Sequence, residues 1–307
     1  MRSQNDESRY IISVGAIPII LGEGSKPVSE KHLQVNCELL EKWLVAFLKS
    51  ECTTVRGINK AIIGLSGGVD SAITAYLCAK AFGPENTFVF RMPYKISSQE
   101  SLSHAQLVID DLGLVDRVIE ITDAVDGYLR LEPEASPTRI GNVCSRVRMT
   151  ILYDQAAKLG GLPIGTGNKT ERLFGYYTWH GDDAPPINPL GDLYKTQLWE
   201  LARHLGVPAE IINKPATADL VKGQTDEGDF GISYARADLI LNAIVSGYRP
   251  EGLLNHGVSQ EELNIVLNRL NGTHWKRHMP TVAMLSDTAI NEFYLRPVDY
   301  RMPQNSP

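Results

Sequence analysis

A glycine-rich turn stands directly between a short apolar run and a helical pattern, and no other feature of the chain constrains its fold as strongly. The apolar run Ala61–Leu65 is typical of a buried parallel strand, and Ala72–Phe82 has the pattern of a helix. The turn between them, Ser66–Ser71, presents backbone N–H groups and the positive end of a helix dipole to an anion. Gly67 and Gly68 let phosphate oxygens approach the backbone, so the turn predicts a phosphate site.

Asp70 adds a second property to this turn. A carboxylate beside a phosphate repels it unless a divalent cation lies between them, so the turn predicts a nucleotide polyphosphate with Mg²⁺. No lysine follows the glycines as in a Walker loop, and the Gly-x-Gly-x-x-Gly pattern of dinucleotide redox folds is missing. The turn resembles the pyrophosphate loop of the N-type ATP pyrophosphatases, which implies ATP as the ligand. The alternative is an ordinary strand-to-helix turn whose glycines serve only its geometry.

Composition limits the class of protein and its partners. The 307 residues suffice for one large domain or two small ones, and an apolar content of 43% is ordinary for a soluble globular protein. The formal net charge of −6 argues against a nucleic-acid partner, and no apolar stretch approaches the ~20 residues that cross a membrane. The four cysteines form no C-x-x-C pair and no zinc-like spacing, so we expect reduced thiols in a cytoplasmic protein.

Strand and helix patterns alternate along the chain, which predicts an α/β fold. We expect a Rossmann-like parallel sheet with helices on both faces, similar to the adenine nucleotide alpha-hydrolases. The expected strands are 61–65, 87–92, 117–121 and 162–165. The expected helices are 33–49, 69–82, 97–112, 140–159, 192–205, 234–245 and 260–270. Segments 182–188 and 215–231 are expected to be loops, either functional lids or plain surface linkers.

Ligands of such sheets bind beyond the carboxyl ends of the strands. Three segments are therefore expected on one rim: Ser66–Ser71, Met92–Ser98 and Thr166–Glu171. Glu171 would then join Asp70 from a different strand end, which is how a Mg²⁺ that bridges phosphates is commonly held. Considered alone, Glu171 would be an ordinary carboxylate at a helix start.

A longer series of motifs, spread over about residues 33–234, resembles the ammonia-dependent NAD synthetases. The series comprises Ser66–Ser71, Gly141–Met149, Gly165–Glu171, Gly175–Thr178, Gly181–Asp182, Asn188–Leu190, Asp192–Thr196, Thr217–Leu220 and Gly223–Glu227. The first motif marks the superfamily only, whereas the ordered series marks the synthetase family. The resemblance implies a ligase that adenylates the carboxylate of nicotinic acid adenine dinucleotide (deamido-NAD) with ATP. Ammonia would then displace AMP, with pyrophosphate as the other product.

The resemblance also implies roles for individual residues of this chain. The implied ATP-binding residues are Gly64, Leu65, Ser66, Gly67, Gly68, Val69, Asp70, Ser71, Met92, Thr166, Lys195 and Thr217. Asp70 and Glu171 would hold Mg²⁺. The implied catalytic residues are Asp70, Glu171, Asp182 and Lys195, and the implied contacts of deamido-NAD are Arg146, Trp179 and Lys276.

Two of these side chains also invite an argument from helix geometry. Lys195 lies in the first turn of the predicted 192–205 helix, where a cation opposes the dipole and so indicates a bound anion; the alternative is a solvated first-turn lysine. Arg146 and Arg148 lie two residues apart on one helix and therefore face different directions. Only one of the two arginines is expected to point at the rim.

The chain departs from the family pattern at three places. Trp179 replaces a common lysine, and Pro186 replaces a common acidic residue before the Asn-Pro-Leu motif. The segment Thr273–Pro280 matches the family at Lys276, but its histidine match is ambiguous. These departures fall on the second substrate rather than on ATP. Trp179 offers a ring that can stack on a pyridine or an adenine, or it is simply a packed tryptophan.

We expect one synthetase-like domain over residues 1–307, with an N-terminal extension (1–32), a core (33–250) and a C-terminal substrate and dimer segment (251–307). About 60 residues precede the first strand and residue 2 is Arg2, so no glutaminase domain of ~250 residues with an N-terminal cysteine is expected. Ammonia would arrive free or from a separate subunit. The resemblance further implies a homodimer.

Two other functions remain open at this stage. The first is an adenylating enzyme of the same scaffold, either a tRNA thiolase or an amide ligase for a different carboxylic acid. The acidic balance and the lack of partnered cysteines disfavour the thiolase. The second is a non-catalytic nucleotide-binding module, which would have no need for Asp70 and Glu171 together.

Overall fold

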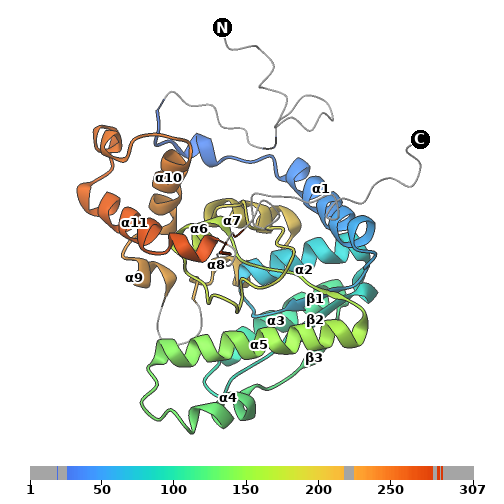
Figure 1. The fold of residues 1–307 in the computed structure, drawn as a ribbon. Helices are drawn as coiled ribbons and strands as arrows, with labels where there is room; N and C mark the ends of the chain where they lie inside the picture. Colours follow the sequence, from blue (N-terminus) through green and yellow to red (C-terminus); the bar gives the residue numbers. More distant parts are fainter. Residues whose placement is uncertain (1–18, 20–25, 218–224, 279–281, 284, 286–307) are drawn as a thin grey trace.

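A four-stranded parallel sheet in the order β3-β2-β1-β4 lies at the centre of the fold in our computed structural model (Figure 1). The structure describes residues 19, 26–217, 225–278, 282, 283 and 285. The strands are β1 (Ala61–Gly64), β2 (Thr87–Arg91), β3 (Val115–Val118) and β4 (Leu162–Pro163). Parts of the predicted terminal segments, and residues 218–224 of the last two motifs, lie outside the described residues.

Eleven α-helices occur within the described ranges. They are α1 (Cys37–Leu48), α2 (Val69–Phe82), α3 (Gln99–Leu112), α4 (Thr122–Leu129), α5 (Pro137–Leu159), α6 (Lys169–Phe174), α7 (Lys195–Leu205), α8 (Ala209–Asn213), α9 (Asp226–Phe230), α10 (Tyr234–Val245) and α11 (Gln260–Gly272). Short 3₁₀ turns at Glu30–Leu33, Pro84–Asn86, Pro250–His256 and His274–Arg277 and a π-helical turn at Lys49–Val55 complete the order. The predicted α/β class is confirmed.

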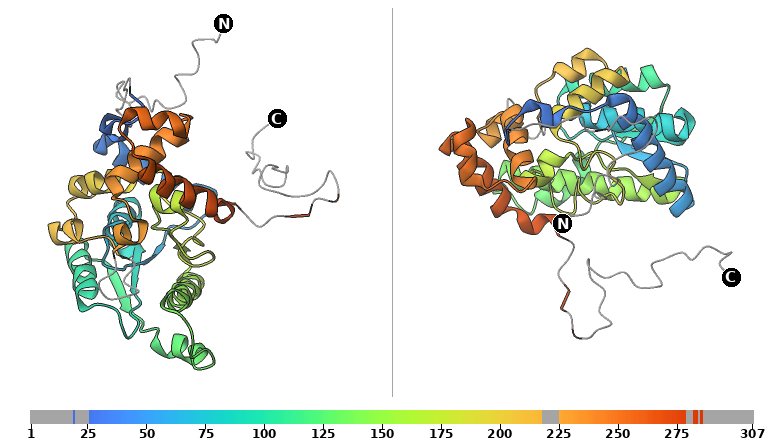
Figure 2. Two further views of the ribbon diagram at one scale, coloured as in Figure 1. Left: turned by 90° about the vertical axis from the view of Figure 1, so that its left-hand side faces the viewer. Right: turned by 90° about the horizontal axis from the view of Figure 1, so that it is seen from above.

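The strand β1 is covered on both faces of the sheet, which explains why its residues are all apolar and do not alternate with polar ones. Ile63 of β1 belongs to the core under α1, α2, α3 and α7, whereas Ile62 belongs to the core under α4 and α5 on the other face. A strand covered on both faces has no position left for a polar side chain. A third core, around Phe174 and Tyr234, joins α6, α10 and α11. The two views of Figure 2 show α10 and α11 (orange) to one side of the central sheet.

Several element boundaries differ from the sequence prediction. The predicted 33–49 helix begins only at Cys37, because the Asn36 side chain caps it by accepting a hydrogen bond from the Leu39 N–H. The predicted 192–205 helix begins at Lys195, where Gln197 accepts a hydrogen bond from the Tyr194 N–H. The third strand lies two to three residues earlier than predicted, and α9 occupies part of the segment predicted to be a loop.

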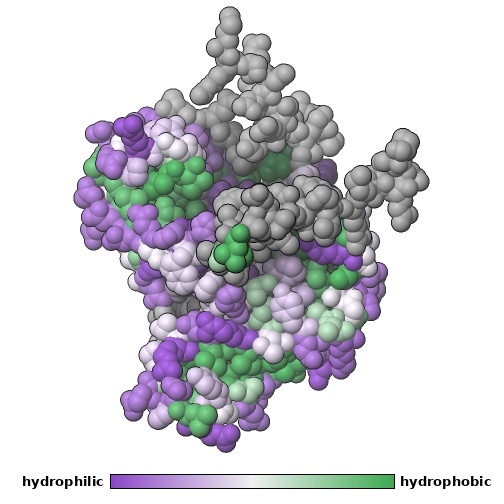
Figure 3. All heavy atoms as spheres, in the orientation of Figure 1, coloured by the Kyte–Doolittle hydropathy of each residue, from purple (hydrophilic) through white to green (hydrophobic). Residues whose placement is uncertain are grey.

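No described helix is both long and apolar enough to cross a membrane. On the face drawn in Figure 3, hydrophilic side chains surround separate apolar patches.

Asp238 on α10 ties the start of α6 to the start of α7. Its fully buried carboxylate accepts hydrogen bonds from Thr170 Oγ1 (2.6 Å) and from Thr196 N and Oγ1 (2.9 and 2.8 Å). Burial raises the pKa of Asp238 to about 6, even though these hydrogen bonds favour the charged form. Near neutral pH the carboxylate is therefore ionised and fixes the two helix starts that carry Glu171 and Lys195.

We expect Asp238→Ala to lower the free energy of unfolding by about 3 kcal/mol, because it leaves buried hydroxyl and amide donors without their acceptor. Urea denaturation of the full chain measures this change. Asp110→Ala removes an exposed carboxylate that accepts a hydrogen bond from Gln106, and we expect it to cost less than about 0.5 kcal/mol. Equal losses in the two variants would contradict the structural role of Asp238.

Candidate active site

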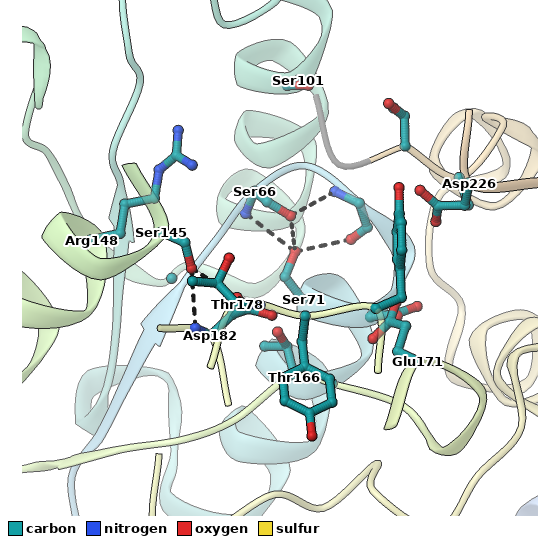
Figure 4. A pocket seen from close by; sticks show the side chains of 18 of the residues that line it. Ser66, Ser71, Ser101, Ser145, Arg148, Thr166, Glu171, Thr178, Asp182 and Asp226 are labelled. Carbon is teal, nitrogen blue, oxygen red and sulfur yellow. Dashed lines mark hydrogen bonds between the residues drawn. The ribbon is translucent and has the colours of Figure 1, made fainter. Parts of the chain in front are cut away.

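A cavity of about 810 Å³ lies at the carboxyl ends of the strands (Figure 4). Residues at or after the carboxyl ends of β1, β2 and β4 line it together: Gly64–Ser66, Gly68–Ser71, Met92, Pro93, Ser97, Ser98, Thr166, Gly167 and Glu171. The three segments predicted for one rim thus meet at one cavity. Thr217, Lys195, Asp182 and Lys276, which come from later in the chain, also line it.

The glycine turn is closed by its own serines. Ser71 Oγ donates to the Gly68 carbonyl (3.0 Å) and accepts from the Ser66 N–H (3.2 Å). Gly67 has a φ of +81°, and a Cβ on it would lie 2.1 Å from the Ser101 carbonyl oxygen. Gly68 caps α2 without a side-chain hydrogen bond, so the first amides of this helix are left for a ligand.

A buried ion pair stands beside the turn. Lys195 Nζ lies 2.7 Å from Asp70 Oδ1, and Asn168 Nδ2 donates to Asp70 Oδ2 over 2.8 Å. Lys195 is only 4% exposed, so its interpretation as a solvated lysine is wrong. Burial opposes the charged form, but Asp70 and Glu171 outweigh it and raise the pKa of Lys195. The anion that Lys195 faces in this structure is Asp70.

Glu171 combines the two roles that the sequence leaves open. It forms a capping box on α6, in which Oε2 accepts from the Asn168 N–H (3.1 Å) while Asn168 Oδ1 accepts from the Glu171 N–H (2.9 Å). It also lines the cavity near Asp70. Burial, and then the charge of Asp70, raise the pKa of Glu171 well above its ordinary value. Two carboxylates therefore share one lysine.

These two carboxylates supply oxygen ligands of the kind that hard divalent cations take. Within the described residues, no group of three or more His, Cys, Asp or Glu side chains is arranged to hold a metal ion. A cation at Asp70 and Glu171 would need further oxygens from a bound substrate.

Asp182 lies in a separate polar network of the same cavity. Its Oδ1 accepts from Ser145 Oγ (2.8 Å) and from the Thr178 N–H (3.0 Å), as Figure 4 shows for Ser145. Burial raises the pKa of Asp182 above its ordinary value, although the hydrogen bonds oppose this. The carboxylate is thus fixed in position and is more basic than an exposed aspartate.

One arginine of the pair on α5 faces the cavity, but it is Arg148 and not Arg146. Arg148 lines the cavity and donates from Nε to the Met92 carbonyl over 3.0 Å. Arg146 donates from Nε and Nη2 to the Trp179 carbonyl, each over 3.3 Å. Trp179 packs edge-on against Trp275, with ring centroids 5.2 Å apart. Neither Arg146 nor Trp179 is among the residues that line the cavity.

Lys276 reaches the cavity from the C-terminal side. Its Nζ donates to the carbonyls of Gly175 (2.7 Å) and Tyr177 (2.6 Å), and burial lowers its pKa. Four further charged residues that the sequence analysis did not name line the cavity: Arg91, Lys214, Asp229 and Arg269. Asp226 and Asp229 lie on α9, inside a segment that was predicted to be a loop. The helix-capping residue Thr225 is the sequence signal that could have indicated this short helix.

The fold and this cavity define an α/β protein of the nucleotide-binding type, with a charged centre beside a glycine turn. A family model for NAD synthase matches residues 40–280, and the chain belongs to this family. It is 42% identical over 254 residues to the NH(3)-dependent NAD(+) synthetase of Fusobacterium nucleatum subsp. nucleatum, covering 82% of this chain and 98% of the relative. The predicted family is confirmed, and the chain is an enzyme, a ligase.

Solved structures agree with this assignment. NMN synthetase from Francisella tularensis is similar with a TM-score of 0.72 and 30% identity, over 83% of this chain and 100% of that one. The NH3-dependent NAD synthetase of Campylobacter jejuni is similar with a TM-score of 0.70 and 30% identity, over 81% and 100%.

Proposed function

We propose that this enzyme amidates deamido-NAD to NAD with ATP and ammonia, and releases AMP and pyrophosphate. The observation that carries the proposal is the position of the Lys195–Asp70 pair and Glu171 against the Ser66–Ser71 turn in one cavity. Relatives that are 42% to 44% identical, with 92% to 98% of their own length covered, are named NH(3)-dependent NAD(+) synthetases. Adenylation fits this chemistry, because a carboxylate is a poor electrophile until it carries a good leaving group.

The ATP side of the reaction rests on the turn and the residues around it. The amides at the start of α2 and the hydroxyls of Ser66 and Ser71 would take phosphate oxygens. Thr166 and Thr217 line the same cavity and would contact ATP. Lys195 would act as a point charge on the phosphates, where it stabilises the charge that develops as pyrophosphate leaves.

Asp70 and Glu171 fit Mg²⁺, because two neighbouring carboxylates share a single lysine and offer only oxygen ligands. When bound, Mg²⁺ supplies positive charge that polarises phosphate oxygens. Asp70 and Glu171 would each contribute carboxylate oxygen, and the phosphates would complete the set.

Asp182 is the residue that we assign to the ammonia step. When ammonia attacks the acyl carbon and AMP departs, one proton leaves the nitrogen, and a fixed carboxylate of raised pKa can accept it. Arg148 and Lys276 line the cavity and would face the acid substrate. We retain Arg146 and Trp179 as proposed contacts for the part of the dinucleotide that extends beyond the cavity.

The remaining features belong to the same proposal. We infer a single synthetase-like domain that takes ammonia, either free or from a separate subunit, and that assembles as a homodimer in the cytoplasm. The matched relatives support the domain arrangement, because the alignment covers 98% of the first one's length.

A specific observation favours a second candidate, an amide ligase for the smaller nicotinic acid mononucleotide. The solved structure from Francisella tularensis, to which this chain is similar with a TM-score of 0.72, is named an NMN synthetase. Trp179 and Pro186 also depart from the family pattern at positions assigned to the second substrate.

An assay of the purified full chain with ATP, Mg²⁺ and ammonium tests the two candidates side by side. With deamido-NAD, we expect NAD and AMP in equal amounts, and no NAD when ammonium is omitted. A kcat/KM at least ten times higher with nicotinic acid mononucleotide would favour the second candidate. No turnover with either acid would contradict both.

A further inference from the structure

Six basic side chains line the cavity within the described residues: Arg91, Arg148, Lys195, Lys214, Arg269 and Lys276. Lys195 is held by the buried Asp70, and Lys276 donates to two backbone carbonyls. Lys214, in contrast, has neither a buried carboxylate nor a pair of carbonyls as its partners in the part of the chain that the structure describes. Its Nζ donates to the neutral hydroxyl of Ser101 (3.1 Å) and lies 3.4 Å from the carboxylate of Glu100, whose side chain is 63% exposed. A pair with so exposed a carboxylate contributes little.

Lys214 and the glycine turn both contact Ser101. Gly67 lies directly against the backbone of Ser101, because a Cβ on it would be 2.1 Å from the Ser101 carbonyl oxygen. Lys214 contacts the hydroxyl of the same residue. Figure 4 shows Ser101 on the helix that passes above the turn. Ser66, Gly68, Ser101 and Lys214 all line the cavity, so one serine separates the lysine from the turn.

A bound triphosphate would need more positive charge near the turn than Lys195 provides. Of the other two lysines that line the cavity within the described residues, Lys195 is paired with Asp70 of the turn, and this carboxylate offsets part of its charge. A triphosphate would bring several negative charges into the same space. The Lys214 side chain is only 13% exposed, so its ammonium group has little water around it and interacts strongly with an anion.

We propose that Lys214 binds the terminal phosphates of ATP and retains the pyrophosphate after adenylation. The inference rests on the proposed function only in taking ATP as the nucleotide. On binding, the ammonium group exchanges the Ser101 hydroxyl and the exposed Glu100 carboxylate for phosphate oxygens. Both partners are weak, so the exchange loses little, and Lys214 would add a second positive charge to the one that Lys195 brings to the phosphates.

Calorimetric titration of the full chain with ATP, pyrophosphate and AMP, in Mg²⁺ and without acid or ammonium, tests the proposal. Lys214→Met keeps the apolar stem and removes the charge. We expect it to weaken ATP and pyrophosphate binding by about 10- to 100-fold and to leave AMP binding unchanged, because AMP lacks the terminal phosphates. Lys214→Arg, which keeps the charge, should recover most of the lost affinity.

Lys80→Met is the matched control, since Lys80 pairs with Glu41 on α1 outside the cavity. It should bind all three ligands like the unmodified protein. Unchanged ATP affinity in Lys214→Met, or an equal loss for AMP, would overturn the proposal, the second because it indicates a general structural effect. Omitting the acid keeps the test independent of which acid the enzyme amidates.

Discussion

Asp70→Asn is expected to reduce kcat/KM for amide formation by roughly 10³-fold. The carboxylate serves two neighbours at once, because it neutralises Lys195 at 2.7 Å and accepts from Asn168 at 2.8 Å. The asparagine variant removes the charge that would bind a divalent cation and leaves the buried ammonium group without its counterion. Steady-state rates of AMP and NAD formation, with thermal unfolding to confirm folding at the assay temperature, measure the effect.

Glu41→Gln provides the comparison for this variant. It also removes a carboxylate from a lysine pair, Glu41–Lys80 at 2.7 Å, but on the outer face of α1 and α2. We expect activity within about twofold of the unmodified enzyme, because this partly exposed ion pair lies outside the cavity and contributes little. If Asp70→Asn retained more than a tenth of the activity, the charged centre would not be the site of adenylation. A non-catalytic nucleotide-binding protein would show no amide formation to lose.

The elements that local sequence determines were predicted well. The strand at Ala61 and the helix Val69–Phe82 were predicted within one residue, because a doubly buried strand and a glycine N-cap leave their marks in adjacent residues. The short helices α4, α6, α8 and α9 were not predicted. With five to eight residues each, they are too short to show helical periodicity. Phe230 of α9 packs edge-on against Phe174, 5.1 Å between centroids, which no local pattern reveals.

The candidate site likewise has features that the sequence predicts and features that it does not. That strand ends meet at one rim follows from parallel topology, so Ser66–Ser71 and Glu171 were expected together. The ion pair between Lys195 and Asp70 joins residues 125 apart, and its partners could not be matched from spacing. For Arg146 and Arg148, helix geometry predicted different directions but not which one faces inward. That depends on how α5 rotates on the sheet, where the carbonyl of Met92 receives Arg148.

Gly67→Ala is expected to lower kcat/KM by about 100-fold or more, since a displacement of the turn by about 1 Å misplaces the phosphates. Two penalties act on this variant. The φ of +81° disfavours any side chain, and the new methyl group would lie 2.1 Å from the Ser101 carbonyl oxygen. Because that oxygen is backbone and not a flexible side chain, the turn itself has to move. The change should appear in ATP affinity as well as in rate.

Gly113→Ala separates these two penalties. Gly113 ends α3 with a φ of +63°, and nothing lies within 4 Å of the position that its Cβ would take. Gly113→Ala should lose about 1 kcal/mol of stability to the backbone strain, measured by urea denaturation, and Gly67→Ala should lose more because its methyl group also meets a backbone atom. Only Gly67→Ala should also lose activity and ATP affinity, because only there does the methyl group meet a neighbour. If the two variants kept equal activity, the contact between the turn and Ser101 would have no part in holding the phosphates. The contact of both Lys214 and the turn with Ser101 would then no longer be evidence that Lys214 lies close to the phosphates.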